Sequence, residues 1–248
     1  MRKPLIAGNW KMFKTKEECL DFANELKSLY HDTDVRAVVC APFIYLEALK
    51  SAFVGIGIRV GAQNAYFKDE GPFTGEISVK MLEQYQVDYC IVGHSERRQY
   101  FGETDEMVNQ KLLRLLEGPI APILCIGEDL EEREQGGEFL AVRNQLVGAL
   151  QGVTAGMAGK LVIAYEPVWA IGTGKTAAPE QAEEMCEFIR NALEAIYGED
   201  LADQAPVLYG GSVRPDNIAR VMNMRNIDGA LVGGASLNVK QFMDMIDF

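Results

Sequence analysis

One carboxylate in this chain has the surroundings that a catalytic base needs. Glu166 stands where an apolar run, residues 161–165, meets a segment rich in glycine, residues 167–177. Pro167 disfavours helical angles for the residue before it, so the run should end extended, with the Glu166 carboxylate at its tip. The apolar residues 168–171 give the next loop a face that could close over a ligand, as proton abstraction away from water requires. A buried glutamate with a structural contact is the alternative.

Two further side chains could assist such a base. His94 lies where a predicted strand passes into a short helix, whose positive end disfavours a cationic ring. We therefore expect a neutral imidazole that donates a hydrogen bond; a structural histidine is the alternative. Lys11 follows the first apolar run, and it could be a solvated surface charge, an electrostatic clamp or a Schiff-base nucleophile. With two histidines and no clustered Cys or His, the sequence predicts no metal site.

Two Gly-Gly turns could bind an anion. Residues 210–212 and 233–236 each follow an apolar run and precede a helical pattern. Main-chain N–H groups in such turns can approach an anion closely, and a helix N-terminus adds a favourable dipole. Each turn alone is as compatible with a tight turn, but the matched pair predicts a phosphate site.

The whole chain alternates short apolar runs with longer amphipathic segments. We predict strands at residues 5–7, 37–40, 58–61, 89–92, 123–126, 161–165, 207–209 and 229–232. The clearest predicted helices are residues 16–30, 104–116, 138–150 and 179–197.

Eight such units in 248 residues predict an α/β fold, a (β/α)₈ barrel that forms one domain over residues 1–248. An open doubly wound sheet is the runner-up, but the glycines at 55–61 and 174–176 only approximate nucleotide-binding motifs. In a barrel, the carboxyl ends of the strands share one face, so Asn9, Lys11, His94, Glu166 and both glycine turns should meet there.

The composition argues against some classes of binding partner. A net charge of −12 argues against nucleic acid and against an anionic membrane surface. We interpret the acidic run at 128–134 as a solvated helical face, and no stretch is long enough to span a bilayer. Five scattered cysteines without a Cys-x-x-Cys pair predict buried, reduced thiols in a cytoplasmic protein.

Four segments resemble the signature segments of the triosephosphate isomerase family. They are residues 8–12, 93–98, 164–177 and 209–213, and they occur in the family's order along the chain. The resemblance implies a TIM barrel and the interconversion of dihydroxyacetone phosphate and D-glyceraldehyde 3-phosphate through an enediol(ate), with no cofactor.

The resemblance also implies roles for individual residues. Glu166 would be the base, His94 the neutral electrophile and Lys11 a second catalytic group. Residues 167–177 would form a closing lid. The substrate-binding residues would be Asn9, Lys11, Glu96, Gly172, Ser212, Gly233 and Gly234. Among them, Glu96 would act by holding residues that contact the substrate.

A homodimer in the cytoplasm is the state that the resemblance implies. The loop at 65–76 would reach into the partner subunit, with Thr74 near the neighbouring active site. Phe13 departs from the asparagine that many family members carry, at a position near the expected dimer contact.

Two rival functions fit the same fold. One is an aldolase-type enzyme that uses Lys11 as a Schiff base, and the other is a catalytically silent barrel scaffold. A silent scaffold predicts damaged catalytic positions, whereas Asn9, Lys11, His94 and Glu166 are all present.

Overall fold

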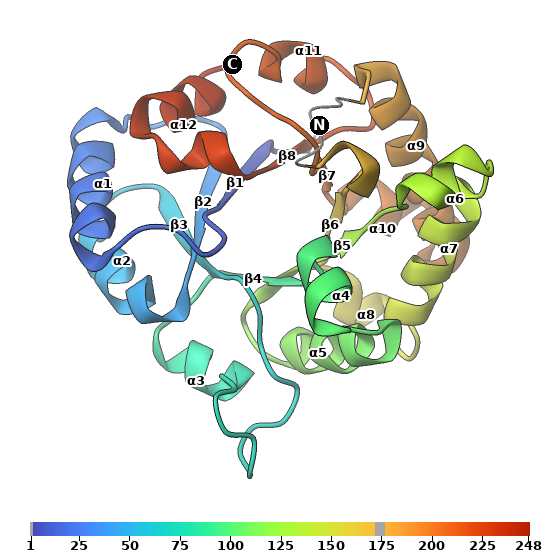
Figure 1. The fold of residues 1–248 in the computed structure, drawn as a ribbon, viewed down its shortest axis with the longest axis horizontal. Helices are drawn as coiled ribbons and strands as arrows, with labels where there is room; N and C mark the ends of the chain where they lie inside the picture. The colour runs from blue at the N-terminus through green and yellow to red at the C-terminus, as the bar shows by residue number, and fades with distance from the viewer. Residues whose placement is uncertain (1, 172–176) are drawn as a thin grey trace.

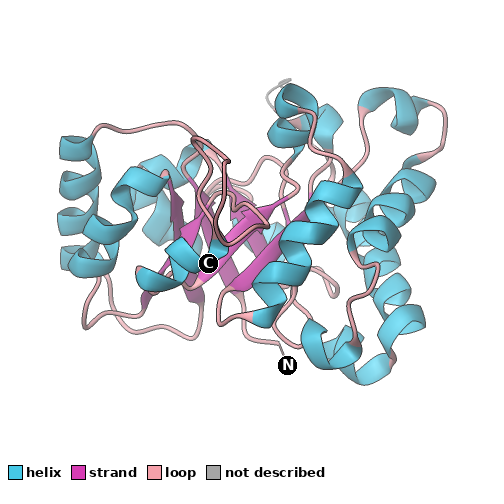
Figure 2. Cartoon of the chain, turned by 90° about the horizontal axis from the view of Figure 1, so that it is seen from below, coloured by secondary structure: helices cyan, strands magenta, loops and turns pink. Residues whose placement is uncertain are grey.

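Eight parallel strands close into a barrel in the computed structural model, which describes residues 2–171 and 177–248. Neighbours in the sequence are neighbours in the barrel, and β1 pairs with β8 to close it. Helices surround the strands on all sides (Figure 1, Figure 2). The predicted (β/α)₈ barrel is therefore confirmed and the open sheet is excluded. The strands are β1 (Leu5–Asn9), β2 (Arg36–Ala41), β3 (Ile58–Ala62), β4 (Tyr89–Val92), β5 (Ala121–Ile126), β6 (Val162–Tyr165), β7 (Val207–Tyr209) and β8 (Gly229–Val232).

The four longest predicted helices are present with ends shifted by one residue at most. The α-helices are α1 (Lys16–Leu29), α2 (Leu46–Ala52), α3 (Val79–Gln84), α4 (Ser95–Phe101), α5 (Asp105–Glu117), α6 (Leu130–Glu134), α7 (Glu138–Ala149), α8 (Ala155–Ala158), α9 (Pro179–Tyr197), α10 (Glu199–Gln204), α11 (Ile218–Met222) and α12 (Val239–Ile246). Three 3₁₀ turns accompany them, η1 (Phe43–Tyr45), η2 (Val168–Ala170) and η3 (Gly234–Leu237).

The strands are largely apolar because most of their side chains are buried on both faces, although Arg59 on β3 is exposed. Side chains alternate along a strand, so Leu5 and Ala7 pack inside the barrel while Ile6 packs toward the helices. The interior cluster holds two of the cysteines, Cys40 and Cys125, and all five are buried without a disulfide. The prediction that the cysteines are buried is confirmed.

The longest excursion from the barrel comes after β3. In Figure 1 the chain between β3 and α3 projects from the lower edge of the molecule. Tyr66 packs against Phe67 and Phe73 at ring-centroid distances of 4.4 and 4.7 Å, and its N–H donates to the Ile77 carbonyl. These contacts give the projecting loop a small core of its own, while Thr74 on this loop is exposed.

No helix in residues 2–171 or 177–248 combines the length and the apolar character needed to cross a membrane.

Candidate active site

A cavity of about 530 Å³ opens at the carboxyl ends of the strands. The sequence-predicted residues Asn9, Lys11, His94, Glu166, Ser212, Gly233 and Gly234 all line it. The remaining lining residues are Ala170, Ile171, Gly210, Gly211, Val213, Arg214, Leu231 and Ala235. The barrel thus brings together groups that are up to 226 positions apart in the chain, from Asn9 to Ala235.

Glu166 and His94 meet at this cavity. The Nε2 atom of His94 lies 3.0 Å from Oε1 of Glu166, and the Glu166 side chain is only 3% exposed. Ser95, to which we assigned no role from the sequence, holds the same carboxylate twice: its N–H donates to Oε2 at 2.9 Å and its hydroxyl to Oε1 at 3.2 Å. The carboxylate is therefore held by groups at the start of α4 while it faces an open cavity.

Close backbone packing places Glu166 at the tip of β6. Its N–H donates to the carbonyl of Ile126 at 2.8 Å, which extends the β5–β6 pairing by one residue. A Cβ on Gly127 would lie 1.7 Å from the Glu166 carbonyl oxygen, and a Cβ on Gly210 would lie 2.9 Å from its Cγ. Neither position has room for a side chain, so a glycine directly after each neighbouring strand lets Glu166 reach the cavity.

The tautomer of His94 can be deduced from its place as the N-cap of α4. Its Nδ1 accepts a hydrogen bond from the Glu96 N–H at 3.2 Å. A ring nitrogen that accepts an N–H carries no proton of its own, so the imidazole proton is on Nε2, the atom that faces Glu166. The ring is thereby set up as a donor toward the cavity.

Lys11 is held in a strained backbone conformation. Its φ angle of 50° lies in the left-handed region, which is uncommon for a residue other than glycine. The Asn9 side chain accepts from the Lys11 N–H at 3.0 Å, and Gln63 donates to the Lys11 carbonyl at 2.9 Å. The Lys11 ammonium pairs with Glu96 at 2.7 Å. Glu96 itself does not line the cavity, so its contact with the site runs through Lys11 and through the backbone bond to His94.

The two glycine turns are ordered in different ways. Gly233 leads directly into the 3₁₀ turn η3, where the Ser236 hydroxyl and N–H both donate to the Gly233 carbonyl at 2.7 and 2.9 Å. Ser212, in contrast, is separated from α11 by a loop. In this loop the Asn217 side chain donates to the Ser212 carbonyl at 2.9 Å and accepts from the Arg214 N–H at 2.8 Å. A side chain, more than a helix end, orders the Ser212 turn.

The first part of the predicted lid is anchored by Glu128. The Trp169 indole donates to Glu128 Oε1 at 2.7 Å, and the Tyr165 hydroxyl donates to the same oxygen at 3.0 Å. Our interpretation of 128–134 as a solvated face is wrong for Glu128, which is fully buried ahead of α6. Burial raises the pKa of Glu128 above its ordinary value. The hydrogen bonds and the charge of Arg133 act in the other direction, but burial is the larger effect. The predicted phosphate ligand Gly172 lies outside the described residues, as does most of the glycine-rich part of the lid.

Within the described part of the chain, no group of three or more His, Cys, Asp or Glu side chains could hold a metal ion.

A closed eight-stranded barrel with a carboxylate, an imidazole and a lysine around one cavity is typical of barrel enzymes that work by acid–base chemistry. Comparison with known proteins identifies the family. The family model of triosephosphate isomerase matches residues 4–248. Triosephosphate isomerase of Alkaliphilus oremlandii is 50% identical over 248 residues, and the alignment covers both chains completely. That of Carboxydothermus hydrogenoformans is 52% identical over 247 residues, covering 99% of this chain and 98% of the relative. The chain belongs to the triosephosphate isomerase family.

Proposed function

We propose that this chain interconverts dihydroxyacetone phosphate and D-glyceraldehyde 3-phosphate, with Glu166 as the base that moves the proton. Isomerisation of triose phosphates is the function that goes with the family. The 3.0 Å approach of His94 Nε2 to the Glu166 carboxylate is the observation that carries the assignment of the base. This contact places a proton acceptor, Glu166, and a hydrogen-bond donor, His94, beside one cavity. The acceptor suits the two carbons between which the proton moves, and the donor suits the two oxygens attached to them.

The chemical step needs both groups at once. Glu166 takes a proton from the carbon beside the carbonyl, and His94 and Lys11 stabilise the oxygen that becomes negative in the enediol(ate). A proton then returns from Glu166 to the neighbouring carbon, and the hydroxyl proton of the enediol passes to the former carbonyl oxygen, so that the carbonyl and hydroxyl groups exchange places. A positioned base contributes about 10²–10⁴-fold, and one oriented donor to the oxyanion contributes about 10²–10³-fold. Asn9 supports Lys11 through its bond to the Lys11 N–H and contacts the substrate from β1.

Glu166 has to exchange partners before it can act. Both of its oxygens accept hydrogen bonds from Ser95, so the carboxylate is not yet available to a substrate carbon. We infer that binding of the triose frees at least one oxygen, and that Ser95 is the resting partner that the substrate displaces.

The phosphate group is held by the two glycine turns that line the cavity. Ser212, Gly233 and Gly234 supply main-chain N–H groups there, which suit an anion. Ala170 and Ile171 bring an apolar edge to the same cavity. Exclusion of water by that edge protects the enediol(ate), which would otherwise lose its phosphate group.

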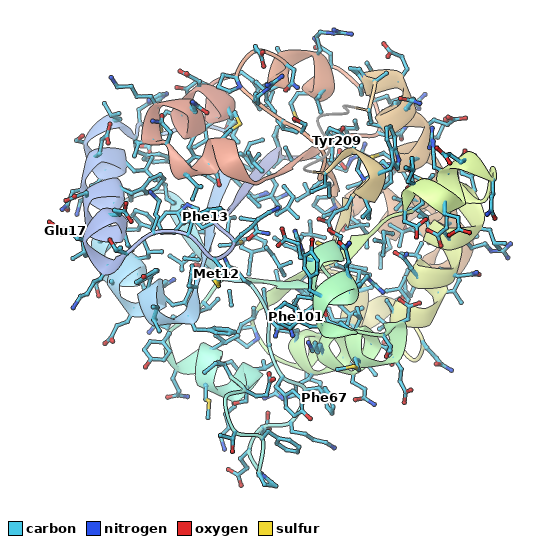
Figure 3. The ribbon with its side chains drawn as sticks, viewed as in Figure 1. Met12, Phe13, Glu17, Phe67, Phe101 and Tyr209 are labelled. Carbon is cyan, nitrogen blue, oxygen red and sulfur yellow. The ribbon has the colours of Figure 1, made fainter. Side chains whose placement is uncertain are left out.

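A homodimer is the second part of the proposal. Met12 and Phe13 are 94% and 55% exposed, and Phe101 is exposed as well. Figure 3 shows Met12 and Phe13 near the centre of this view, Phe101 below and to the right of them, and Phe67 near the base of the loop at 65–76. Apolar side chains exposed around a projecting loop are typical of a protein interface. Sedimentation equilibrium should give twice the chain mass, and a monomer that retains full activity would contradict this part.

A cytoplasmic location is the third part. Burial raises the pKa of Cys40 to about 12, and the other cysteines are buried too, so these thiols are protected but unpaired. Unpaired thiols are usual for proteins of a reducing compartment. Fractionation of cells that express the chain should recover it in the cytoplasm.

One assay separates the proposed function from its rivals. The purified chain, given D-glyceraldehyde 3-phosphate, should produce dihydroxyacetone phosphate that a coupled reductase consumes. A silent scaffold would give no product. An aldolase-type enzyme would be inactivated by borohydride in the presence of substrate through an adduct on Lys11, whereas we expect no such adduct.

A further inference from the structure

The substrate and the protein carry charges of the same sign. The chain has a net charge of −12, and a phosphate monoester carries close to two negative charges at neutral pH. Charges farther away than about 8 Å are largely screened at physiological salt, so the side chains at the cavity decide whether the substrate is attracted. Among the described residues that line the cavity, the cationic ones are Lys11 and Arg214.

These two cations are in different situations. The Lys11 ammonium lies 2.7 Å from the Glu96 carboxylate, in a close ion pair. The Arg214 side chain is 61% exposed, and its Nε lies 3.6 Å from the carboxylate of Asp216, which is also exposed. An ion pair this long and this exposed is weak and easily exchanged. Arg214 can therefore replace Asp216 with an incoming anion, whereas Lys11 is already engaged.

The backbone that carries Arg214 is well ordered. The Arg214 N–H donates to the Asn217 side chain at 2.8 Å, and its carbonyl accepts from the N–H groups of Asn217 and Ile218 at 3.1 and 3.0 Å. The same Asn217 side chain holds the carbonyl of Ser212. A long, exposed cation thus extends from a fixed point two residues from the Ser212 turn.

We propose that Arg214 is the residue that captures the substrate's phosphate dianion at the mouth of the cavity. It attracts the anion, gives up its contact with Asp216 and guides the phosphate to the turn at Ser212. This inference rests on the proposed function, because it takes the phosphate site to be at Ser212, Gly233 and Gly234. Arg214 acts on association and does not take part in proton transfer.

The test compares kcat/KM of the full chain at several ionic strengths. We expect Arg214→Gln to lower kcat/KM about three- to tenfold at about 20 mM salt and hardly at all at about 0.5 M salt, with kcat almost unchanged. Arg214→Lys should retain most of the activity because it keeps the charge. Asp216→Asn should raise kcat/KM at low salt, since it removes the competing carboxylate. A damaged fold cannot produce that gain.

Arg220→Gln is the matched control. Arg220 is an exposed arginine on α11 that does not line the cavity, so its removal changes the net charge equally at a different place. If Arg214→Gln and Arg220→Gln respond alike to salt, or if Asp216→Asn lowers kcat/KM, the capture role is overturned. Binding of inorganic phosphate, measured by calorimetry at low salt, should weaken in Arg214→Gln and not in Arg220→Gln. Because that measurement needs no turnover, it judges the capture role separately from the proposed isomerase reaction.

Discussion

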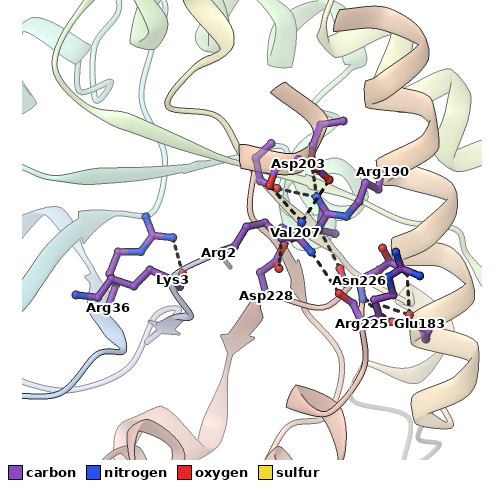
Figure 4. A network of polar contacts seen from close by, with 12 residues as sticks. Arg2, Lys3, Arg36, Glu183, Arg190, Asp203, Val207, Arg225, Asn226 and Asp228 are labelled. Carbon is purple, nitrogen blue, oxygen red and sulfur yellow. Dashed lines mark hydrogen bonds and ion pairs between the residues drawn. The ribbon is translucent and has the colours of Figure 1, made fainter. Parts of the chain in front are cut away.

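Each end of the barrel holds a buried carboxylate, but the two carboxylates differ in their surroundings. At the amino ends of the strands, Asp228 pairs with Arg2 before β1 and with Arg190 on α9 (Figure 4). Its Oδ2 accepts from Arg190 at 2.6 Å and from the Val207 N–H at 2.9 Å, while Oδ1 contacts Arg2. Arg190 in turn donates to the carbonyls of Ala202, Ala205 and Asn226. The charges of Asp228 and Arg190 are therefore compensated by groups of the protein, without a ligand.

Glu166 is even less exposed than Asp228, but it faces a cavity. Its partners are His94 and Ser95, and under the proposed function an entering substrate takes the place of Ser95. Burial alone therefore does not distinguish the proposed base from a structural carboxylate. What differs is whether the partners of the carboxylate can be exchanged, and mutations at the two ends should therefore affect different quantities.

The largest effect is expected at Glu166. Glu166→Asp retracts the carboxylate by one methylene, and we expect kcat to fall by about 10²–10⁴-fold because the base no longer reaches the substrate carbon. Affinity for a phosphate-containing substrate analogue should change much less, since the phosphate is held elsewhere. Steady-state kinetics and analogue titration would check this, and equal losses in both quantities would contradict a base role.

Asp228 should show the opposite result. Asp228→Asn keeps the shape but leaves the Arg190 charge buried and uncompensated, which costs about 3–5 kcal/mol in the free energy of unfolding. Activity per folded molecule should stay close to that of the parent chain.

Arg59→Gln is the control for Asp228, because Arg59 pairs with Asp88 at 3.0 Å on the exposed surface. It should cost about 1 kcal/mol or less. Urea unfolding at a fixed protein concentration measures both variants. A lowered kcat with unchanged stability in Asp228→Asn would mean that the two ends are not separate in function.

A smaller effect is expected where a single side chain orders the phosphate turn. Asn217→Ala removes the hydrogen bonds to Ser212 and Arg214, each worth about 1 kcal/mol, so KM should rise by up to about thirtyfold while kcat changes little. Asn109→Ala, which removes amide bonds to Ala149 and Gln151 far from the cavity, should lower stability and leave KM unchanged. Equal KM values in the two variants would rule out a positioning role for Asn217.

Much of this arrangement could be predicted from the sequence. All eight strands were predictable because strands buried on both faces are short apolar runs, and their carboxyl ends must share one face of a closed barrel. That reasoning alone brought Lys11, His94 and Glu166 to one cavity. The short helices α2, α3 and α8 were not predicted, since about two turns or fewer show too little periodicity.

The contacts between distant strand ends were not predictable. Ser95 appears in the sequence as an ordinary helix-start residue, and only the curvature of the closed barrel brings the end of β4 to Glu166 at the end of β6. Arg214 looks like any surface arginine until the cavity is known. Glu128 is the clearest failure, because nothing in an acidic run distinguishes its one buried member, whose burial depends on Tyr165 and Trp169 from another strand and loop.

Glu128 also leads to the smallest expected effect, one that depends on pH. Burial raises the pKa of this carboxyl above its ordinary value of 4.5, so the folded protein binds the proton more tightly than the unfolded chain. The stability that protonated Glu128 contributes is complete below the unfolded pKa and is lost as pH rises through the folded pKa. Glu128→Gln cannot titrate, yet it keeps an oxygen to accept from Trp169.

The free energy of unfolding of the parent chain, relative to Glu128→Gln, should therefore fall as the pH is raised from the ordinary carboxyl pKa of 4.5 toward neutrality. Urea unfolding across this range measures the difference. A difference that rises with pH would show that Arg133 and the hydrogen bonds outweigh burial. In that case the carboxylate that anchors the lid would be compensated within the chain in the same way as Asp228, and the contrast between the two ends would be confined to Glu166.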